Sequence, residues 1–347
     1  MADETNNSRA TLSDVCRLCG VSSATVSRVL NGTAKVSPET RERVMRVVTE
    51  LGYVPNSAAR SLAGQRERML GVVFPEIGNG FWANILKGLD AAAADRGYHL
   101  LTGFSHGHLD ERELVLRVLR EGRIDALILM NLRLDQELAA EATRFKTPVV
   151  LIDRPIAELQ AGSVTIDNVA GAASAMAHLF EHGYHDVMLL IGDAATYDSK
   201  QRLLGCRQAA AEAGVTLDET LIVGGTFTEE SGREAIEQIL EQHGRPPRAI
   251  FCFNDNLAIG AMEALRDRGW RVPEEVAVIG FDDIESARHL GLTSVHVPLN
   301  EIGRTAAYLA IDAVESKARG VNHVLSTRLV VRQSCGCGAR APIVRKV

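Results

Sequence analysis

Short apolar runs alternate with amphipathic stretches from Leu70 onwards, and this alternation constrains the fold more than any other feature of the chain. Uninterrupted apolar runs are typical of strands buried on both faces of a parallel sheet, and the stretches between them predict covering helices. The predicted strands are Leu70–Phe74, His99–Gly103, Ala126–Met130, Val149–Ile152, Val187–Ile191, Ala249–Phe253 and Val276–Gly280. The predicted helices are Phe81–Arg96, Asp110–Arg120, Val169–His182, Ser199–Ala213, Glu229–Gln242, Leu257–Arg268 and Glu301–Lys317.

The pattern recurs as two comparable sets, at about residues 69–166 and 168–297. We therefore predict an α/β fold of two doubly wound parallel-sheet lobes, with a cleft at the carboxyl ends of the strands. A nucleotide-dependent enzyme is the alternative for such a fold. However, Phe81 and Trp82 directly follow Gly78 and Gly80 and block the close approach of a pyrophosphate. No nucleophile–base pair or metal cluster accompanies these glycines, so we predict that the protein is not an enzyme.

Three short helices are predicted before residue 54, at Leu12–Cys19, at Ser23–Asn31 and from Pro38 to about Leu51. Ser22 and Ser37 stand where an N-cap is needed, and Gly52 follows the last helix. These helices predict a small all-α domain in front of the α/β lobes.

The two parts of the chain differ in charge. Residues 1–68 hold ten Lys/Arg and seven Asp/Glu, which gives them a net charge of +3. Because the net charge of the whole chain is −6, that of the remaining residues is −9. A basic module on an acidic body favours a polyanionic partner. No stretch reaches the ~18 apolar residues of a membrane helix, and the N-terminus lacks the apolar segment of a signal peptide. We therefore expect no membrane partner and a cytoplasmic protein.

Cys16, Cys19, Cys335 and Cys337 suggest a four-cysteine zinc site. Cys16 and Cys19 lie three residues apart on a predicted helix, where both can face inward as small hydrophobic residues. The Cys-x-Cys spacing is also unusual for a zinc knuckle. We therefore predict no metal site and no cofactor.

Several segments closely resemble signatures of the lactose-repressor family of bacterial transcription regulators. The helix-turn-helix signature is similar to Thr11–Asn31 (TLSDVCRLCGVSSATVSRVLN), and its continuation is similar to Val36–Arg41 and Gly52–Asn56. Phe253–Ala261 (FNDNLAIGA) and Val278–Asp283 (VIGFDD) resemble motifs of the sensor domain, which are shared with periplasmic sugar-binding proteins. The resemblance implies a sequence-specific DNA-binding regulator, in particular a repressor, whose two α/β lobes form a periplasmic-binding-protein-like sensor.

The resemblance also implies a domain plan. We expect a disordered arm at 1–10, a helix-turn-helix domain at 11–54, a hinge helix at 55–65, a sensor domain at 66–335 and a tail at 336–347. Lobe 1 is expected at about 66–166 plus 298–325, and lobe 2 at about 167–297 plus 326–335. The tail has no leucine heptads, so a tetramerising coiled coil is not predicted.

A recognition helix presents its first residues to base edges in the major groove. Arg28 is the candidate for a bidentate contact to guanine, with a phosphate contact as the alternative. The family's hinge helices pair in the minor groove, where Leu62 matches the residue that wedges a base step. A pair of hinges implies a homodimer on a pseudo-palindromic operator of double-stranded DNA. The expected DNA-binding residues are Ser22, Ser23, Ala24, Thr25, Ser27, Arg28, Asn31, Lys35, Asn56, Ala59 and Leu62.

The sensor motifs imply a small-molecule effector between the lobes. Aromatic side chains pack on the apolar face of a sugar ring, and charged side chains bond to its hydroxyls. This chemistry favours a monosaccharide; a purine or nucleoside stacked on Trp82 and Phe227, or a protein partner, remains an alternative. The expected effector-binding residues are Asn79, Phe81, Trp82, Asp153, Arg154, Asp198, Arg202, Phe227, Asn254 and Asp282. Asp255 is interpreted as a helix cap and is left out of the site.

Overall fold

A computed structural model describes residues 10–30, 36–53, 66–75, 80–105, 111–130, 144–154, 162–316 and 321–337. The chain forms two compact units, Met1–Glu67 and Arg68–Val347. Within the described ranges, no helix has the length and apolar character that a membrane crossing requires.

The first unit is a bundle of three helices, α1 (Leu12–Cys19), α2 (Ser23–Leu30) and α3 (Pro38–Leu51). The side chain of Thr11 caps α1 in a reciprocal arrangement with Asp14, and Ser37 caps α3. Left-handed glycines, Gly20 and Gly52, end α1 and α3. Their apolar faces meet in a small core of Val15, Cys19, Val26, Val29 and Val44.

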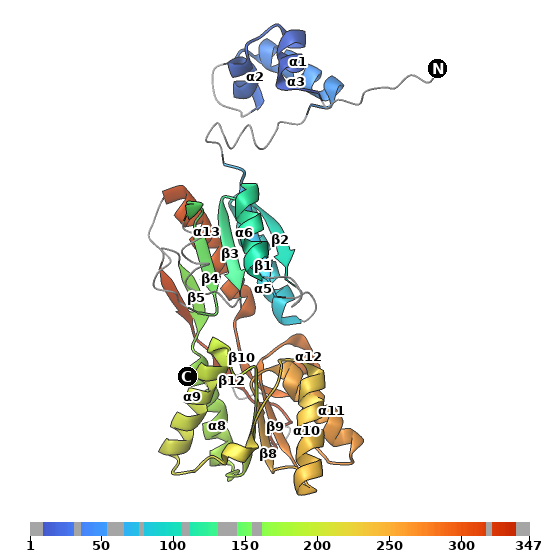
Figure 1. Cartoon of the computed structure of the whole chain (residues 1–347), viewed down its shortest axis with the longest axis vertical. Coiled ribbons are helices and arrows are strands. Elements are labelled where there is room, and N and C mark those ends of the chain that lie inside the picture. The colour runs from blue at the N-terminus through green and yellow to red at the C-terminus, as the bar shows by residue number, and fades with distance from the viewer. Residues whose placement is uncertain are drawn as a thin grey trace, which may run out of the picture. The chain divides into compact units, whose positions relative to one another are not determined.

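The second unit contains two six-stranded sheets (Figure 1). The first has the order β11-β5-β4-β3-β1-β2, and the second has the order β12-β10-β9-β8-β6-β7. All neighbouring strands are parallel except β10 and β12. The strands are β1 (Met69–Phe74), β2 (His99–Phe104), β3 (Ala126–Met130), β4 (Val149–Ile152), β5 (Ser163–Ile166), β6 (Val187–Gly192), β7 (Ile222–Gly224), β8 (Ala249–Cys252), β9 (Ala277–Asp282), β10 (Thr293–His296), β11 (Asn322–Leu325) and β12 (Arg328–Val330).

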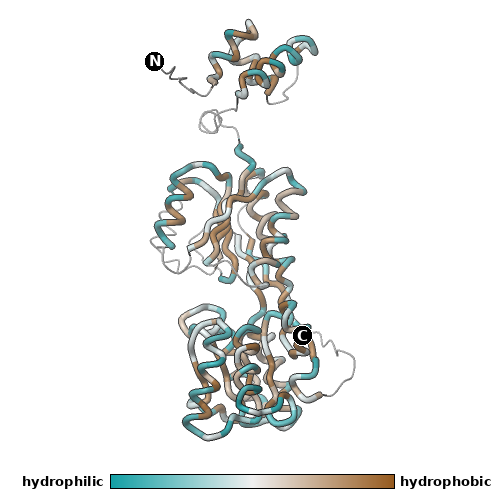
Figure 2. The backbone as a smooth tube through the Cα atoms, turned by 90° about the vertical axis from the view of Figure 1, so that its right-hand side faces the viewer, coloured by the Kyte–Doolittle hydropathy of each residue, from teal (hydrophilic) through white to brown (hydrophobic). Residues whose placement is uncertain are grey.

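Helices cover the strands, which form the apolar interior of each lobe (Figure 2). The central strands β3, β4, β6, β8 and β9 are buried along their whole length. The helices of this unit are α5 (Gly80–Asp95), α6 (Glu111–Glu121), α8 (Asn168–Glu181), α9 (Tyr197–Glu212), α10 (Glu229–His243), α11 (Asp255–Asp267), α12 (Glu285–His289) and α13 (Leu299–Ser316). The predicted fold class is confirmed: two parallel α/β lobes follow a small helical head.

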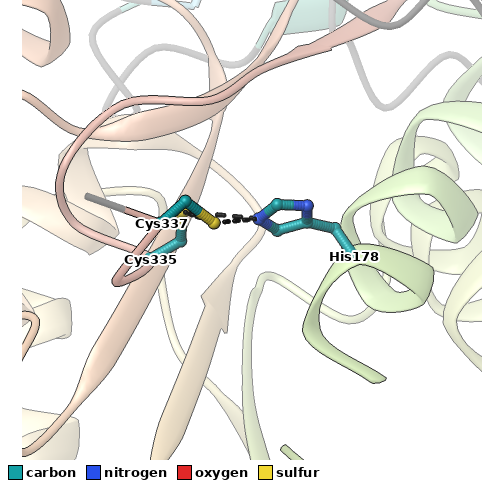
Figure 3. A group of neighbouring side chains, drawn as sticks. All are labelled: His178, Cys335 and Cys337. Atoms are coloured by element: carbon teal, nitrogen blue, oxygen red, sulfur yellow. Dashed lines mark hydrogen bonds between the residues drawn. The ribbon is translucent and has the colours of Figure 1, made fainter. Parts of the chain in front are cut away.

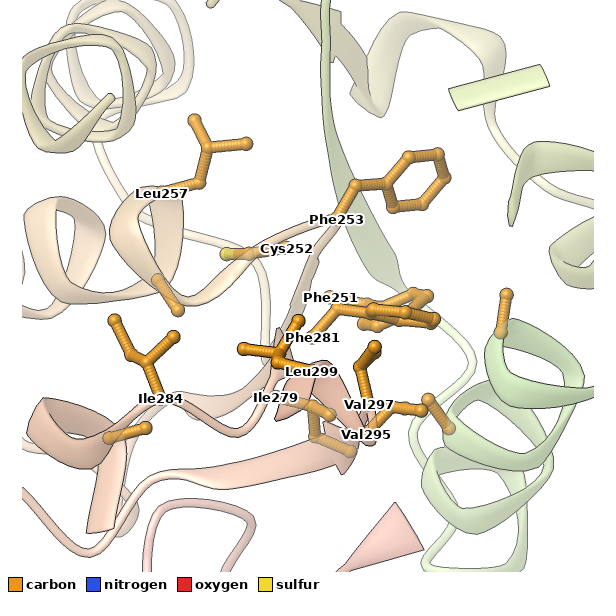
Figure 4. Close-up of a cluster of buried hydrophobic side chains, with 14 of the residues drawn as sticks. Phe251, Cys252, Phe253, Leu257, Ile279, Phe281, Ile284, Val295, Val297 and Leu299 are labelled. Atoms are coloured by element: carbon orange, nitrogen blue, oxygen red, sulfur yellow. The ribbon is translucent and has the colours of Figure 1, made fainter. Parts of the chain in front are cut away.

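The chain passes from one lobe to the other along three segments. It crosses between β5 and α8, between β10 and α13, and between β11 and β12. The third crossing adds β11 to the first sheet and β12 to the second, so the C-terminal part of the chain belongs to both lobes. In the second lobe, Phe251, Phe253 and Phe281 project from the same side of β8 and β9 into the largest apolar core (Figure 4).

Candidate functional site

Helix α2 presents a polar, exposed side and an apolar, buried side. Val26 and Val29 are buried in the core of the first unit, whereas Ser22, Ser23, Ala24 and Arg28 are exposed and Thr25 and Ser27 are half-buried. The hydroxyl of Ser22 accepts a hydrogen bond from the backbone N–H of Thr25 at 3.3 Å, so it caps the helix. The exposed side is therefore made of short polar side chains and one guanidinium group, which is the composition of a helix that contacts base edges.

Other predicted DNA-binding residues lie outside the part of the chain that the structure describes. They are Asn31, Lys35, Asn56, Ala59 and Leu62.

The predicted effector residues that are described all follow the carboxyl ends of parallel strands. Phe81 and Trp82 lie in the first turn of α5 after β1, and Asp153 and Arg154 follow β4. In the second lobe, Asp198 and Arg202 lie on α9 after β6, whereas Phe227, Asn254 and Asp282 stand after β7, after β8 and at the end of β9. In open α/β sheets this edge is where ligands bind. Asn79 lies outside the described residues.

Arg202 is the centre of a buried hydrogen-bond network. Its Nε donates to Asn168 Oδ1 at 2.8 Å, its Nη1 donates to the carbonyl of Phe253, and its Nη2 lies 3.5 Å from Asp198 Oδ2. The guanidinium carbon also lies 3.9 Å from the centre of the Phe281 ring. Only 3% of Arg202 is exposed. Because these contacts fix the plane of the guanidinium group, its remaining N–H groups point in a fixed direction.

Asp282 supplies a buried acceptor beside this network. It is 5% exposed, and its Oδ1 is buried without a hydrogen-bond partner among the described residues. Burial raises the pKa of Asp282 well above its ordinary value; Arg202 opposes this effect, and the carboxylates of Asp255, Asp198 and Asp153 add to it. A buried acceptor without a donor is costly, so this atom is suited to a donor that arrives with a ligand.

Asp153 occupies the equivalent place in the first lobe. It follows β4, which is third in the order of its sheet, just as β9 is third in the other. Both aspartates have a positive φ, 92° at Asp153 and 107° at Asp282. Non-glycine residues in such conformations cost of order 1–3 kcal/mol and cluster at ligand sites. Asp153 is also among the carboxylates whose charge raises the pKa of Asp282.

Asp198 and Asn168 are the other polar side chains of the network around Arg202 in the second lobe. The Asn168 amide donates from Nδ2 to Asp198 Oδ1 at 2.9 Å while its Oδ1 accepts from Arg202. Burial raises the pKa of Asp198, although Arg202 and Asn168 favour its ionised form. Sequence reasoning missed Asn168, which is 2% exposed at the start of α8. A signal was available, because Asp167 and Asn168 follow a strand end just as the other polar residues do.

Aromatic side chains follow the strand ends in both lobes. Trp82 meets Phe81 edge-on with ring centres 4.8 Å apart, and it meets Phe74 at 6.1 Å. Phe227 is half-buried beside Gly192, whose missing Cβ leaves room for the ring. These rings are suited to packing against the C–H face of a ligand.

The interpretation of Asp255 as the cap of α11 is wrong, whereas the effector-binding role of Asn254 stays a prediction. Asn254 is the N-cap of α11: its Oδ1 accepts from Leu257 N–H at 2.9 Å, and its Nδ2 donates to the carbonyl of Phe227 at 3.0 Å. Asp255 is not the cap, because its carboxylate accepts from Ile284 N–H at 2.8 Å and from the Ser294 hydroxyl at 2.6 Å. Asn254 therefore connects two strand ends, and Asp255 supports the segment after Asp282.

The fold and the two sites define a class of protein, a transcription regulator with a helix-turn-helix head and a periplasmic-binding-protein-like sensor. Residues 11–56 match the model of bacterial regulatory proteins of the lacI family, and residues 176–335 match that of a periplasmic binding protein-like domain. The HTH-type transcriptional regulator DegA of Bacillus subtilis is 34% identical over 336 residues, which cover 94% of this chain and 98% of DegA. The chain belongs to the lacI family of bacterial transcription regulators, whose members are not enzymes.

Two solved structures show the same architecture. A complex of the transcriptional regulator CelR with cellobiose has a TM-score of 0.72 and 35% identity, and covers 94% of this chain and 100% of CelR. The Lac repressor dimer bound to operator and the anti-inducer ONPF has a TM-score of 0.81 and 26% identity, with 94% and 99% covered.

Proposed function

We propose that this protein is a repressor that binds a pseudo-palindromic operator as a homodimer and is controlled by a neutral monosaccharide bound at the strand ends of its sensor. The operator and dimer follow the Lac repressor structure, in which a dimer holds operator DNA. The exposed polar side of α2, with Arg28, is the surface assigned to the major groove. The hinge around Leu62, outside the described residues, is assigned to the minor groove.

The observation that supports the sugar is the buried Oδ1 of Asp282, which has no donor among the described residues. A sugar hydroxyl is such a donor, and it can accept at the same time from the fixed guanidinium of Arg202. The aromatic rings of Phe81, Trp82 and Phe227 supply the apolar face that a sugar ring needs. CelR, of similar sequence, was solved with cellobiose.

The charge of the site favours a neutral ligand over a phosphorylated one. Three carboxylates (Asp153, Asp198 and Asp282) stand at these strand ends with two guanidinium groups (Arg154 and Arg202). Burial raises the pKa of Asp198 and Asp282, so this buried and weakly screened place disfavours negative charge, and it would disfavour a phosphate dianion for the same reason. A hydroxylated neutral ring has no such cost, because each hydroxyl both donates and accepts.

The test is a thermal-shift screen of the purified protein against pentoses, hexoses, their phosphates, cellobiose and purine nucleosides. A ligand at about 100 times its Kd adds about 2.7 kcal/mol of native stability. We expect a neutral monosaccharide to raise the melting temperature and to change the affinity for operator fragments selected from random DNA. If a nucleoside has both effects and no sugar does, the proposal of a sugar effector is wrong, and the proposal of an effector-controlled regulator is unaffected.

Variants then assign the hit to the site. Asp282→Ala should weaken ligand binding roughly 5- to 150-fold, because it leaves a buried hydroxyl of the ligand without its hydrogen-bond partner, which costs about 1–3 kcal/mol. Arg207→Ala is the matched control: Arg207 lies on α9 with Arg202, but it is exposed and pairs with Glu219. If both variants bind the ligand equally well, the site lies elsewhere.

A further inference from the structure

The segment after β12 forms a tight turn that brings two thiols together. The backbone N–H of Gly336 donates to the carbonyl of Gln333 at 3.0 Å, and Gly336 has a φ of 82°. Because a glycine takes up this left-handed conformation without strain, Cys335 and Cys337 point to the same side. Their Sγ atoms are 3.2 Å apart, far beyond the ~2.05 Å of a disulfide bond.

Helix α8 brings two imidazole rings to the same place. His178 lies in its last turn and His182 is its C-cap residue, so the two are neighbours at i and i+4 on one face. The Nε2 of His178 lies 3.4 Å from the Sγ of Cys335 and 3.3 Å from that of Cys337. The Nε2 of His182 lies 3.0 Å from the Sγ of Cys337. Figure 3 shows the two thiols facing the ring of His178 from a separate segment.

These distances are close to the edges of a metal tetrahedron. Zn–S bonds of about 2.3 Å and Zn–N bonds of about 2.05 Å give S···S edges of about 3.8 Å and S···N edges of about 3.5 Å. The ligand atoms of His178, Cys335 and Cys337 lie within 4.8 Å of one another, so a small outward movement admits an ion. His182 is exposed, and its ring centre is 4.6 Å from that of His178, so it can close the fourth position.

We propose that His178, His182, Cys335 and Cys337 form a structural zinc site, which joins the C-terminal turn to the end of α8. Two thiolates and two imidazoles favour Zn²⁺ over Mg²⁺ or Ca²⁺, which prefer oxygen ligands. Four protein ligands leave no open position, so the role is structural. The H-x3-H spacing on the helix matches that of known zinc sites.

The site has a defined mechanical effect. The segment before Cys335 is already tied to the second sheet, because the Ser334 hydroxyl donates to the carbonyl of Val278 at 2.6 Å and accepts from Thr293 N–H at 2.8 Å. A bound ion therefore fastens α8 to this sheet at the end of the helix. The opposite end of α8 carries Asn168, which positions Arg202 and Asp198. The ion thus fixes the helix that supports the effector network.

The sequence suggests Cys16 and Cys19 as partners of these thiols, but the prediction drawn from it is that no metal is bound. Cys16 and Cys19 lie in the first unit, where Cys19 is 3% exposed in the core of the helical bundle. The histidine partners are 153 or more positions away in sequence, since His182 and Cys335 are 153 apart. Only the return of the chain to the second sheet after β11 brings them together.

The test is metal binding by the full chain, purified under reducing conditions and stripped with a chelator. After zinc is added back and the excess is removed, we expect about one Zn²⁺ per chain by elemental analysis and a higher melting temperature than that of the stripped protein. With Co²⁺ in place of Zn²⁺, we expect the intense visible absorption of a tetrahedral thiolate site. His178→Ala and Cys335→Ser should each abolish the cobalt spectrum and the thermal shift. His182→Ala should weaken zinc binding measurably, because water replaces one ligand.

Matched controls separate this site from general thiol or imidazole binding. Cys16→Ser alters a half-buried thiol of the first unit, and His185→Ala alters an exposed histidine three residues beyond His182. Both should bind zinc like the unaltered protein. The proposal is overturned if the reduced unaltered protein binds no zinc, if either control loses zinc as the site variants do, or if mass spectrometry of protein kept reduced finds a Cys335–Cys337 disulfide. The unaltered protein serves for the first and last of these measurements, so a site variant that fails to fold does not decide the outcome.

Discussion

At the scale of single residues, Asp255 links stability to pH. Its carboxylate is fully buried, and burial raises its pKa from 3.8 to about 7, although hydrogen bonds from Ser294 and Ile284 act in the opposite direction. The folded protein therefore keeps a proton that the unfolded chain loses above about pH 4. Stability from this group is fully present below about pH 4 and is lost as pH rises through about 7. Burial acts on Asp282 and Asp198 in the same direction.

We predict that Asp255→Asn flattens this dependence. An amide does not titrate, so between pH 5 and pH 8 the unfolding free energy of the variant should fall by roughly 2–3 kcal/mol less than that of the unaltered protein. Urea denaturation at the two pH values measures the difference. Asp312→Asn, which alters a half-exposed carboxylate paired with Arg96, is the control and should leave the slope as it is. An unchanged slope in Asp255→Asn would show that this proton is not taken up on folding.

Arg28 determines specificity if it makes a bidentate contact to guanine. It is exposed on α2. Arg28→Lys keeps the charge but loses the paired geometry, so discrimination at one base pair should fall by about 1–3 kcal/mol while binding to random DNA changes little. Fluorescence anisotropy with the selected operator and its single-base variants measures this. Arg41→Lys, on the exposed side of α3, is the control. Equal weakening on all sequences by Arg28→Lys would make Arg28 a phosphate contact.

The candidate site could be predicted only in part from the sequence. The resemblance to the family implies both Arg202 and Asp282, and Asp282 also belongs to the VIGFDD motif at a strand end. The interactions of Arg202 with Asn168, Phe281 and the Phe253 carbonyl depend on three segments that meet only in the folded lobe. Asn254 and Asp255 are adjacent, and their roles differ because the backbone turns one side chain toward the helix end and the other toward β10. No local pattern distinguishes such neighbours.

At the scale of elements, α5 and α13 pack through glycines. A Cβ built at Gly88 would overlap the carbonyl oxygen of Asn300, and one at Gly303 would overlap that of Ile85. Gly88→Ala must therefore push the two helices apart, with an expected loss of about 3 kcal/mol of unfolding free energy. Gly80→Ala, on the same helix, finds its nearest atom at 3.9 Å and is the control. Chemical denaturation compares them, and equal stability would mean that the helices separate without cost.

The uninterrupted apolar strands are predictable from the sequence, whereas β5, β7, β10, β11 and β12 are absent from the prediction. β1, β3, β4, β6, β8 and β9 are buried on both faces, so their sequences are uninterrupted apolar runs. β7 and β12 have three residues each, and β11 is exposed at three of its four positions. Edge strands are stabilised by pairing with a neighbour rather than by their own burial, so they leave little hydrophobic pattern. β11 and β12 also depend on the third crossing of the chain between the lobes, and no local sequence pattern predicts that crossing.

At the scale of the whole molecule, the two units have separate cores of very different size. The core of the first unit contains five buried residues, Val15, Cys19, Val26, Val29 and Val44, whereas the sensor unit has two larger clusters. A domain below about 70 residues rarely gains more than about 3–5 kcal/mol from one core. The DNA-binding head is therefore the part of the molecule whose folding is most easily lost.

Val26→Ala should impair operator binding without impairing effector binding. Val26 is fully buried between the three helices. The shortened side chain should therefore lower the unfolding free energy of the head by about 2–3 kcal/mol, which is most of its total stability. Operator affinity should fall steeply at 37 °C, while effector binding and the melting of the sensor stay unchanged. Ala24→Ser, on the exposed side of the same helix, should leave the head folded. Calorimetry and operator binding on each variant check this. A drop in the sensor's melting temperature with Val26→Ala would show that the units fold as one, and effector signals would then pass through shared stability rather than through the geometry of the dimer.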